Sequence, residues 1–181
     1  TASTFTGNAH IFSKVYFPRL VTPITSVIYA LLSFFIQLAL MLILMLYFAF
    51  GRGETVQPNM WLFLVPVMIL QMALLGMGLG IIISSITTKY RDLSILVGFG
   101  VHLWMYATPI VYPLSQVPEF LADIIILNPM TAIVNNFKYA FLGCGEPIIS
   151  GWIYSWIFTV IALFLGILVF SKVEKTFIDT V

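Results

Sequence analysis

Long apolar stretches without charge alternate with short charged segments along the chain. Four stretches carry no charged residue: they run for 32 residues after Arg19, 34 after Glu54, 26 after Asp92 and 25 after Glu146. Each exceeds the ~20 residues that a helix needs to cross the hydrocarbon core of a bilayer. Because lipid offers no hydrogen bonds to the backbone, and the alternation typical of barrel strands is missing, these stretches are predicted to be helices.

The pattern therefore predicts an all-α integral membrane protein with four transmembrane helices. The expected spans are residues 22–50, 60–86, 93–112 and 152–171. Pro23 suits the first turn of the first span, where its missing N–H costs little. Pro66 predicts a kink in the second span unless that helix begins later.

The basic residues predict the orientation of these spans. Residues 1–21, 87–92 and 172–181 would share one side of the membrane, and 51–59 and 113–151 the other. The first side holds Lys14, Arg19, Lys89, Arg91, Lys172 and Lys175, and the second holds Arg52 and Lys138. Under the positive-inside rule, both ends of this chain are expected in the cytoplasm.

Composition excludes several other classes of protein. Hydrophobic residues make up 61% of the 181 residues and only 15 are charged, whereas a soluble domain of this length would carry roughly 45. A net charge of +1 with no basic stretch argues against nucleic acid as a partner. Cys144 is the only cysteine, so no internal disulfide can form. No signal peptide is expected, and Thr1 suggests that the chain begins partway into a longer protein.

Residues 1–20 are predicted to form a short amphipathic helix. After Asn8, a plausible N-cap, four apolar residues recur on one helical face until Pro18 ends the pattern. They are Ile11, Phe12, Val15 and Tyr16. Two interpretations remain open: an interfacial helix lying passively in the headgroups, or a docking element for a cytosolic partner. The charged connection 87–92 is open to a similar choice, between a loop that sets the topology and a contact for that partner.

The outer segment 113–151 is long and apolar. Its stretches 119–127 and 130–142 flank the turn Leu127–Pro129, and each has the length for about half a bilayer. This predicts a pair of re-entrant helices, which are tolerated at depth where protein or a water-filled cavity surrounds the turn. Aromatic residues near the outer span ends suit the headgroup level, or else line a ligand path; they are Trp61, Tyr112, Trp152 and Trp156.

No catalytic or metal-binding constellation emerges from the sequence. Within the spans, polar candidates are limited to His102, expected to bond to a neighbouring helix, and the amides Gln37 and Gln71. The run Gly76–Gly80 lies inside an apolar span with no Lys-Ser/Thr after it, so close helix packing explains it better than phosphate binding. Glu119 and Asp123 are the only, and weak, candidates for a membrane transferase.

Five segments together resemble a known family, the permease subunit of bacterial ABC exporters for lipid-linked polysaccharides and polyol-phosphate polymers such as O-antigen, capsule and wall teichoic acid. The matching segments are Asn8–Arg19, Lys89–Asp92, Thr108–Pro113, Leu127–Met130 and Glu174–Phe177, in order and in register. The resemblance covers the whole chain and implies the C-terminal two thirds of a permease with six spans. The four spans would then be the third to the sixth.

The resemblance also implies partners and contact residues. A separate ATPase would bind ATP and Mg²⁺, while this chain binds no cofactor and has no catalytic residue. Residues 8–19 would be the coupling helix, 87–92 a second ATPase contact, and 114–142 the re-entrant pair at the outer mouth. The implied coupling residues are Asn8, His10, Phe12, Lys14, Tyr16, Phe17, Arg19, Tyr90, Arg91 and Asp92. Two permeases and two ATPases would assemble in the bacterial cytoplasmic membrane.

Sugars have apolar ring faces that stack on aromatic side chains and hydroxyls that bond to amides. The residues predicted to line the path are Trp104, Tyr106, Tyr112, Asn128, Phe137 and Tyr139, with core packing as the alternative for each aromatic. Two alternatives to polymer export also remain: a drug or small-lipid exporter of the same superfamily, and a membrane glycosyltransferase.

Overall fold

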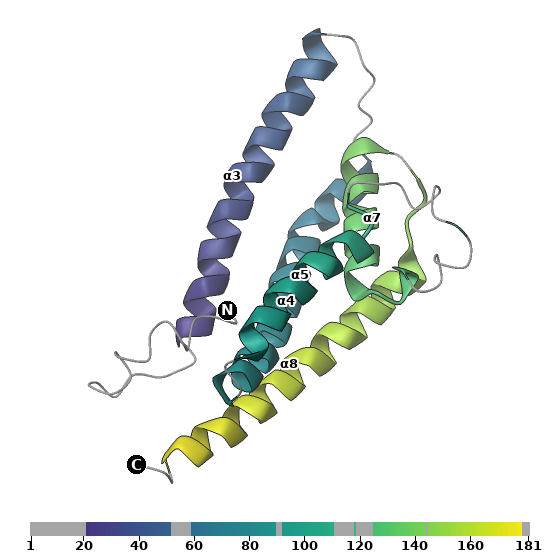
Figure 1. The fold of residues 1–181 in the computed structure, drawn as a ribbon. Helices are drawn as coiled ribbons and strands as arrows, with labels where there is room; N and C mark the ends of the chain where they lie inside the picture. The colour runs from purple at the N-terminus through teal and green to yellow at the C-terminus, as the bar shows by residue number, and fades with distance from the viewer. Residues whose placement is uncertain are drawn as a thin grey trace.

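The chain is helical over most of the residues that the computed structural model describes, which are 21–51, 59–89, 92–110, 118, 125–143 and 145–178. The elements are α3 (Val21–Gly51), the 3-10 helix η1 (Met60–Leu64), α4 (Val65–Lys89), α5 (Leu93–Ala107), α7 (Pro129–Leu142) and α8 (Ile149–Ile178) (Figure 1). The prediction of an all-α fold is confirmed for these residues.

Among the described residues, three helices are long and apolar enough to cross a membrane. They cover Pro23–Gly51, Met60–Thr87 and Ile149–Lys172. The span expected at 93–112 differs, because its helix ends at Ala107 and is a shorter apolar helix of 15 residues. The helix ends because the backbone at Thr108 is extended, with φ -100° and ψ 133°.

α3 contacts the rest of the molecule along one stripe. Its half-buried positions recur at helical spacing, and the other faces are apolar and exposed. The side chains on the stripe are Leu31, Phe34, Leu38, Met41 and Met45, and they pack against a buried cluster of Val65, Ile69, Ala140 and Phe141. Such broad apolar exposure is what a helix facing lipid presents.

Pro66 lies at the start of α4, so the kink that it would cause inside a helix is not expected. Asn59 caps η1 by accepting a hydrogen bond from the Met60 backbone N–H to its side-chain oxygen (2.9 Å). α4 then begins at Val65, so Pro66 is its second residue and lies in the first turn, where no N–H is required. The helix begins later than position 60, and the proline falls at its start instead of its interior.

α4 and α8 form the most closely packed pair of helices. An ideal Cβ built on Gly78 would lie 2.8 Å from the Leu163 backbone nitrogen and 2.9 Å from the Ala162 carbonyl carbon. A Cβ on Gly166 would lie 2.9 Å from the Gly78 carbonyl oxygen. Glycine is required where two backbones approach this closely. Close packing is therefore confirmed as the role of Gly78 within the Gly76–Gly80 run.

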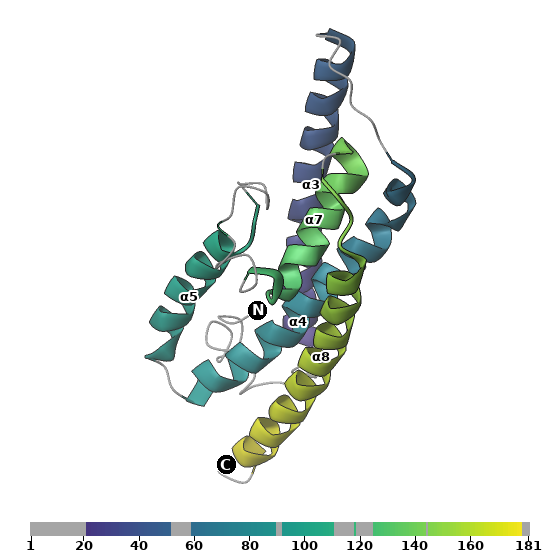
Figure 2. The ribbon, with the colours of Figure 1, turned by 90° about the vertical axis from the view of Figure 1, so that its right-hand side faces the viewer.

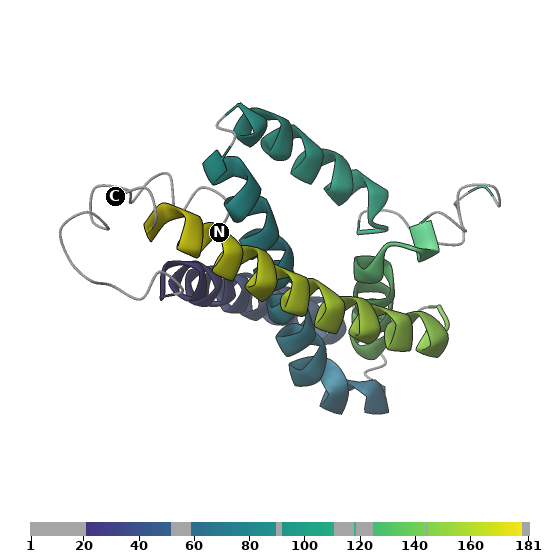
Figure 3. The same ribbon diagram turned by 90° about the horizontal axis from the view of Figure 1, so that it is seen from below.

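α5 stands apart from α8, as Figures 2 and 3 both show. From Leu93 to Ala107 it has no buried residue, and only Leu93 and Val97 are partly covered. The next two residues, Thr108 and Pro109, are buried. α5 thus meets the rest of the described protein mainly at its ends.

α7 matches the predicted apolar stretch 130–142 and begins one residue earlier. Pro129 occupies its first turn, and Gly143 ends it in the left-handed conformation (φ 64°). Of the other predicted stretch, 119–127, the structure describes only residues 125–127. That the stretches 119–127 and 130–142 form a pair of re-entrant helices therefore stays a prediction.

Candidate functional site

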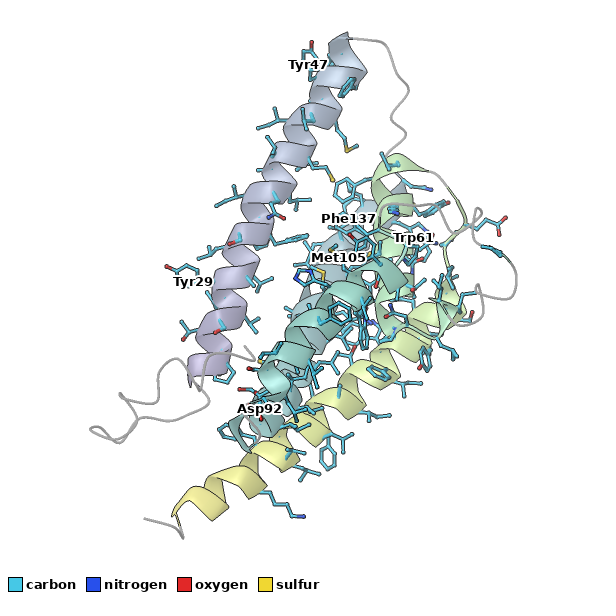
Figure 4. The ribbon with its side chains drawn as sticks, viewed as in Figure 1. Tyr29, Tyr47, Trp61, Asp92, Met105 and Phe137 are labelled. Atoms are coloured by element: carbon cyan, nitrogen blue, oxygen red, sulfur yellow. The ribbon has the colours of Figure 1, made fainter. Side chains whose placement is uncertain are left out.

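Most residues predicted to contact an ATPase lie outside the described part of the chain. This holds for Tyr90, Arg91 and all those between 8 and 19. Asp92 is described: it is exposed, immediately precedes α5, and makes no side-chain capping hydrogen bond to that helix. Its carboxylate therefore lies on the surface at the end of the molecule where α4 is followed by α5 (Figure 4).

The predicted path residues fall into two groups. Trp104 and Tyr106 lie exposed on α5, with 43% and 69% of their surface accessible, and Tyr112 lies outside the described residues. Asn128, Phe137 and Tyr139 are half-buried in and beside α7. The structure thus separates an exposed pair on α5 from a packed group on α7.

The packed group has identifiable contacts. The Phe137 ring lies 4.8 Å from Phe141 and 6.3 Å from Phe34, measured between centroids. Tyr139 meets Trp61 edge-on at 6.0 Å. These geometries are typical of packed aromatic side chains. Phe137 and Tyr139 help to join α7 to α3 and η1, and their part in a path remains a prediction.

Asn128 uses both ends of its amide. Its Oδ1 accepts a hydrogen bond from the Met130 N–H (3.0 Å) and so caps α7, while Nδ2 donates to Thr108 Oγ1 (2.8 Å). Thr108 Oγ1 in turn donates to the Trp104 carbonyl in the last turn of α5 (3.0 Å). The Lys138 ammonium, ten residues further on, donates to the Pro109 carbonyl. α7 is thereby bonded at two points to the end of α5.

Partial burial lowers the pKa of the Lys138 ammonium from its ordinary value of 10.5. The hydrogen bond from Lys138 to the Pro109 carbonyl is stronger from the ammonium than from the neutral amine, because a charged N–H is the stronger donor.

Two further asparagines bond α7 to the segment that leads into α8. Asn136 is fully buried, and its Oδ1 accepts a hydrogen bond from the Ile148 N–H (2.9 Å). Asn135 donates from Nδ2 to the Glu146 carbonyl (2.9 Å). A buried amide held in this way fixes the backbone that it bonds to.

A buried polar network between α4 and α8 was not singled out from the sequence. Gln71 is fully buried; its Nε2 donates to Ser155 Oγ (2.9 Å), and its Oε1 accepts from Trp152 Nε1 (2.6 Å). The ring centroids of Trp152 and Trp61 are 6.0 Å apart. Gln71 was recognised as a mid-span amide, but its partners are more than 80 residues away. Trp152 was predicted to lie at the headgroup level or to line a ligand path, and its hydrogen bond to Gln71 was not foreseen.

The other two polar residues singled out within the predicted spans are exposed. Gln37 lies on an exposed face of α3 and His102 on an exposed face of α5, and the bond expected from His102 to a neighbouring helix stays a prediction. In the described ranges no group of three or more His, Cys, Asp or Glu side chains could hold a metal ion.

Comparison with known proteins decides the family. A model of the ABC-2 type transporter family matches residues 3–142. The chain belongs to the ABC-2 type transporter family. The membership of this family that the five sequence segments indicated is thus confirmed.

Two relatives of this ABC-2 chain are O-antigen export system permease proteins named RfbA. The one from Klebsiella pneumoniae is 28% identical over 179 residues, which cover 97% of this chain and 66% of the relative. The one from Myxococcus xanthus is 31% identical over 155 residues, which cover 82% of this chain and 57% of the relative. The ABC-2 chain therefore spans just under two thirds of the length of the first relative.

Proposed function

We propose that this ABC-2 chain is part of a permease that exports a lipid-linked polysaccharide or polyol-phosphate polymer across the cytoplasmic membrane. The observation that carries the proposal is the similarity to O-antigen export permeases along 97% of the chain. The long apolar helices supply the membrane body that such a permease needs. A separate ATPase supplies the energy, and a second copy of the permease completes the pathway.

The proposed topology has four crossings, with α5 and the residues that follow it forming the third. The start of α3, the end of α4, the start of α5 and the end of α8 lie at one end of the molecule (Figure 1). This arrangement supports the assignment of residues 1–21, 87–92 and 172–181 to one side, and six of the eight basic residues favour the cytoplasm for that side.

The proposed ATPase contacts are residues 8–19 and 87–92; of the coupling residues named above, Asp92 is the one whose position is described. Nucleotide-driven movement of the ATPase would displace this end of α5 and shift the pathway between closed and open conformations. The glycan path is proposed to include Trp104, Tyr106, Tyr112, Asn128, Phe137 and Tyr139.

The function is tested in the organism that carries the permease, by deleting the permease and measuring the polymer inside and outside the cell. Export predicts that the assembled polymer is trapped on the cytoplasmic side and that the intact gene restores it to the surface. Loss of synthesis, with no trapped polymer, would instead favour a glycosyltransferase. In proteoliposomes with its ATPase, the permease is expected to show ATPase stimulation by the trapped lipid-linked polymer; stimulation only by small amphiphiles would contradict polymer export.

Residues 8–19 give a second prediction. Lys14→Glu and Phe17→Ala are each expected to lower export about tenfold, because loss of roughly 1.4 kcal/mol of docking energy has that effect. The permease should remain in the membrane at normal amounts, which immunoblotting of membrane fractions checks. Ser13→Ala, which lies off the predicted apolar face, is the control. Normal export by both variants would exclude a docking role for this segment.

A further inference from the structure

The residues at the C-terminal end of α5 are buried, whereas those along the helix are not. All side chains from Leu93 to Ala107 are exposed or half-buried, whereas Thr108 is 2% exposed and Pro109 is buried. Figure 4 places Asp92 at one end of α5 and Met105 near the other. Within the described part of the chain, α5 is therefore held mainly at its two ends.

A helix of 15 residues is about 22 Å long, shorter than the hydrocarbon core of about 30 Å. The last carbonyls of a helix have no partner within the helix, and lipid offers none. At this end of α5, Thr108 Oγ1 donates to the Trp104 carbonyl, and the Thr108 N–H donates to the Met105 carbonyl (3.4 Å). The Pro109 carbonyl accepts from the Lys138 ammonium.

Two of the groups that complete this end come from α7. Asn128 Nδ2 donates to Thr108 Oγ1, which fixes the hydroxyl so that its own proton points to Trp104. Lys138 bonds the next residue, Pro109. α7 is itself held firmly, since it buries seven residues and bonds through Ala140 to Asn59 and through Asn136 to Ile148. The end of α5 is therefore attached to an anchored helix.

We propose that Asn128 and Lys138 are positioning residues that hold the carbonyl end of α5 against α7 as a pivot. Displacement of the Asp92 end then tilts α5 about this point, while the distance between the end of α5 and α7 stays constant. The proposal deepens the proposed function, on which it rests, by assigning the part of the permease that stays fixed when the ATPase acts.

The bonds are removed by substitutions that keep size. Thr108→Val replaces the hydroxyl with a methyl group and leaves the cap of α7 intact, and Lys138→Met removes the ammonium from a chain of similar length. Thr108→Ser and Lys138→Arg keep the donors and are expected to restore the behaviour of the parent. Asn135→Ala is the matched control, because it removes a bond from α7 that leads to Glu146 instead of α5.

Distances are measured by pulsed electron resonance on spin labels in the complete permease with its ATPase, after Cys144→Ser. One label replaces Leu142 on α7, which is 47% exposed. The second replaces either Met105 or Leu96, which are 47% and 65% exposed on α5. A pair with the second label at Ile153 on α8 reports whether α7 stays packed against α8.

In the parent, the distance from Met105 to Leu142 should be narrow and equal with and without ATP, whereas that from Leu96 should change. The combined Thr108→Val and Lys138→Met change should broaden the Met105 distribution and leave the Ile153 pair unchanged. An equally narrow Met105 distribution in this variant would overturn the proposal. So would a Met105 distance that changes with ATP as much as the Leu96 distance, or a Leu96 distance that does not change.

Transport gives a second readout. Loss of a purely structural role would lower export and ATP hydrolysis together, whereas loss of the pivot lowers export alone. The combined variant should export about tenfold less polymer for each ATP hydrolysed, while its ATPase rate and its amount in the membrane stay normal. If the combined variant fails to assemble, Thr108→Val alone is measured in the same way. Failure of the parent to export any polymer would overturn the proposed function, but the label distances would still decide whether the pivot exists.

Discussion

Replacing Gly78 with alanine is expected to lower the thermal stability of the permease by several degrees in detergent. The new methyl group would lie 2.8–3.1 Å from backbone atoms of Ala162 and Leu163, which cannot move aside as the end of a flexible side chain can. α4 and α8 must separate instead, at a cost of about 1–3 kcal/mol.

Gly76→Ala is the matched control on the same helix. No atom lies within 4 Å of a Cβ at that position, and alanine is the better helix former by about 0.5–1 kcal/mol. Thermal unfolding of the two variants, followed by circular dichroism, should therefore shift in opposite directions. Gly166→Ala should resemble Gly78→Ala, because its methyl group would meet the Gly78 carbonyl oxygen at 2.9 Å. Equal stability of the Gly76 and Gly78 variants would contradict this account of the interface.

Gln71→Leu is expected to destabilise the same pair of helices by about 1–3 kcal/mol. The substitution removes the hydrogen-bond partner of the Trp152 indole N–H and of the Ser155 hydroxyl. Because the interface is buried, water does not replace that partner. Thermal unfolding in detergent measures the loss. Gln37→Leu, the same change on an exposed face of α3, is the control and should have little effect.

A double-mutant cycle assigns the loss to the hydrogen bond from Trp152. Trp152→Phe removes the indole donor, so the combined change with Gln71→Leu should cost less than the sum of the two single changes. Coupling energies for such bonds in membranes average about 0.6 kcal/mol and reach about 1.7 kcal/mol. Strict additivity of the two changes would mean that Gln71 acts on α8 without Trp152.

The apolar stretches and charged breaks in the sequence were sufficient to predict the helices. Lipid leaves the backbone few alternatives, so length and charge alone locate the long helices near their observed bounds. The end of α5 was placed too late, because the apolar pattern continues past Ala107. Pro109 was the available signal: a proline disfavours the helical conformation of the residue before it, and Thr108 is extended. The hydrogen bond from Asn128 to Thr108 could not be predicted, since the two residues are 20 positions apart.

Contacts between helices were harder to predict, because helices that are apolar on every side show no face to pair. Gly78 was an exception, since a glycine in a spanning helix indicates close approach even when its partner is unknown. Gln71 and Trp152 were each noticed, but nothing in their spacing matches this amide with one of the four tryptophans. The residues assigned to the coupling helix lie outside the described part of the chain, so that assignment remains a prediction.

The unequal lengths of α3 and α5 have a consequence for the surrounding lipid. The apolar part of α3 has 29 residues, or about 44 Å, whereas α5 has 15 residues. In the proposed topology, a bilayer of ordinary thickness is thinner than the apolar part of an upright α3 and thicker than the length of α5, a mismatch that tilting of α3 and thinning of the lipid beside α5 would relieve. Longer acyl chains relieve the mismatch at α3 and increase it at α5. Lipid thickness thus acts on the two helices in opposite directions.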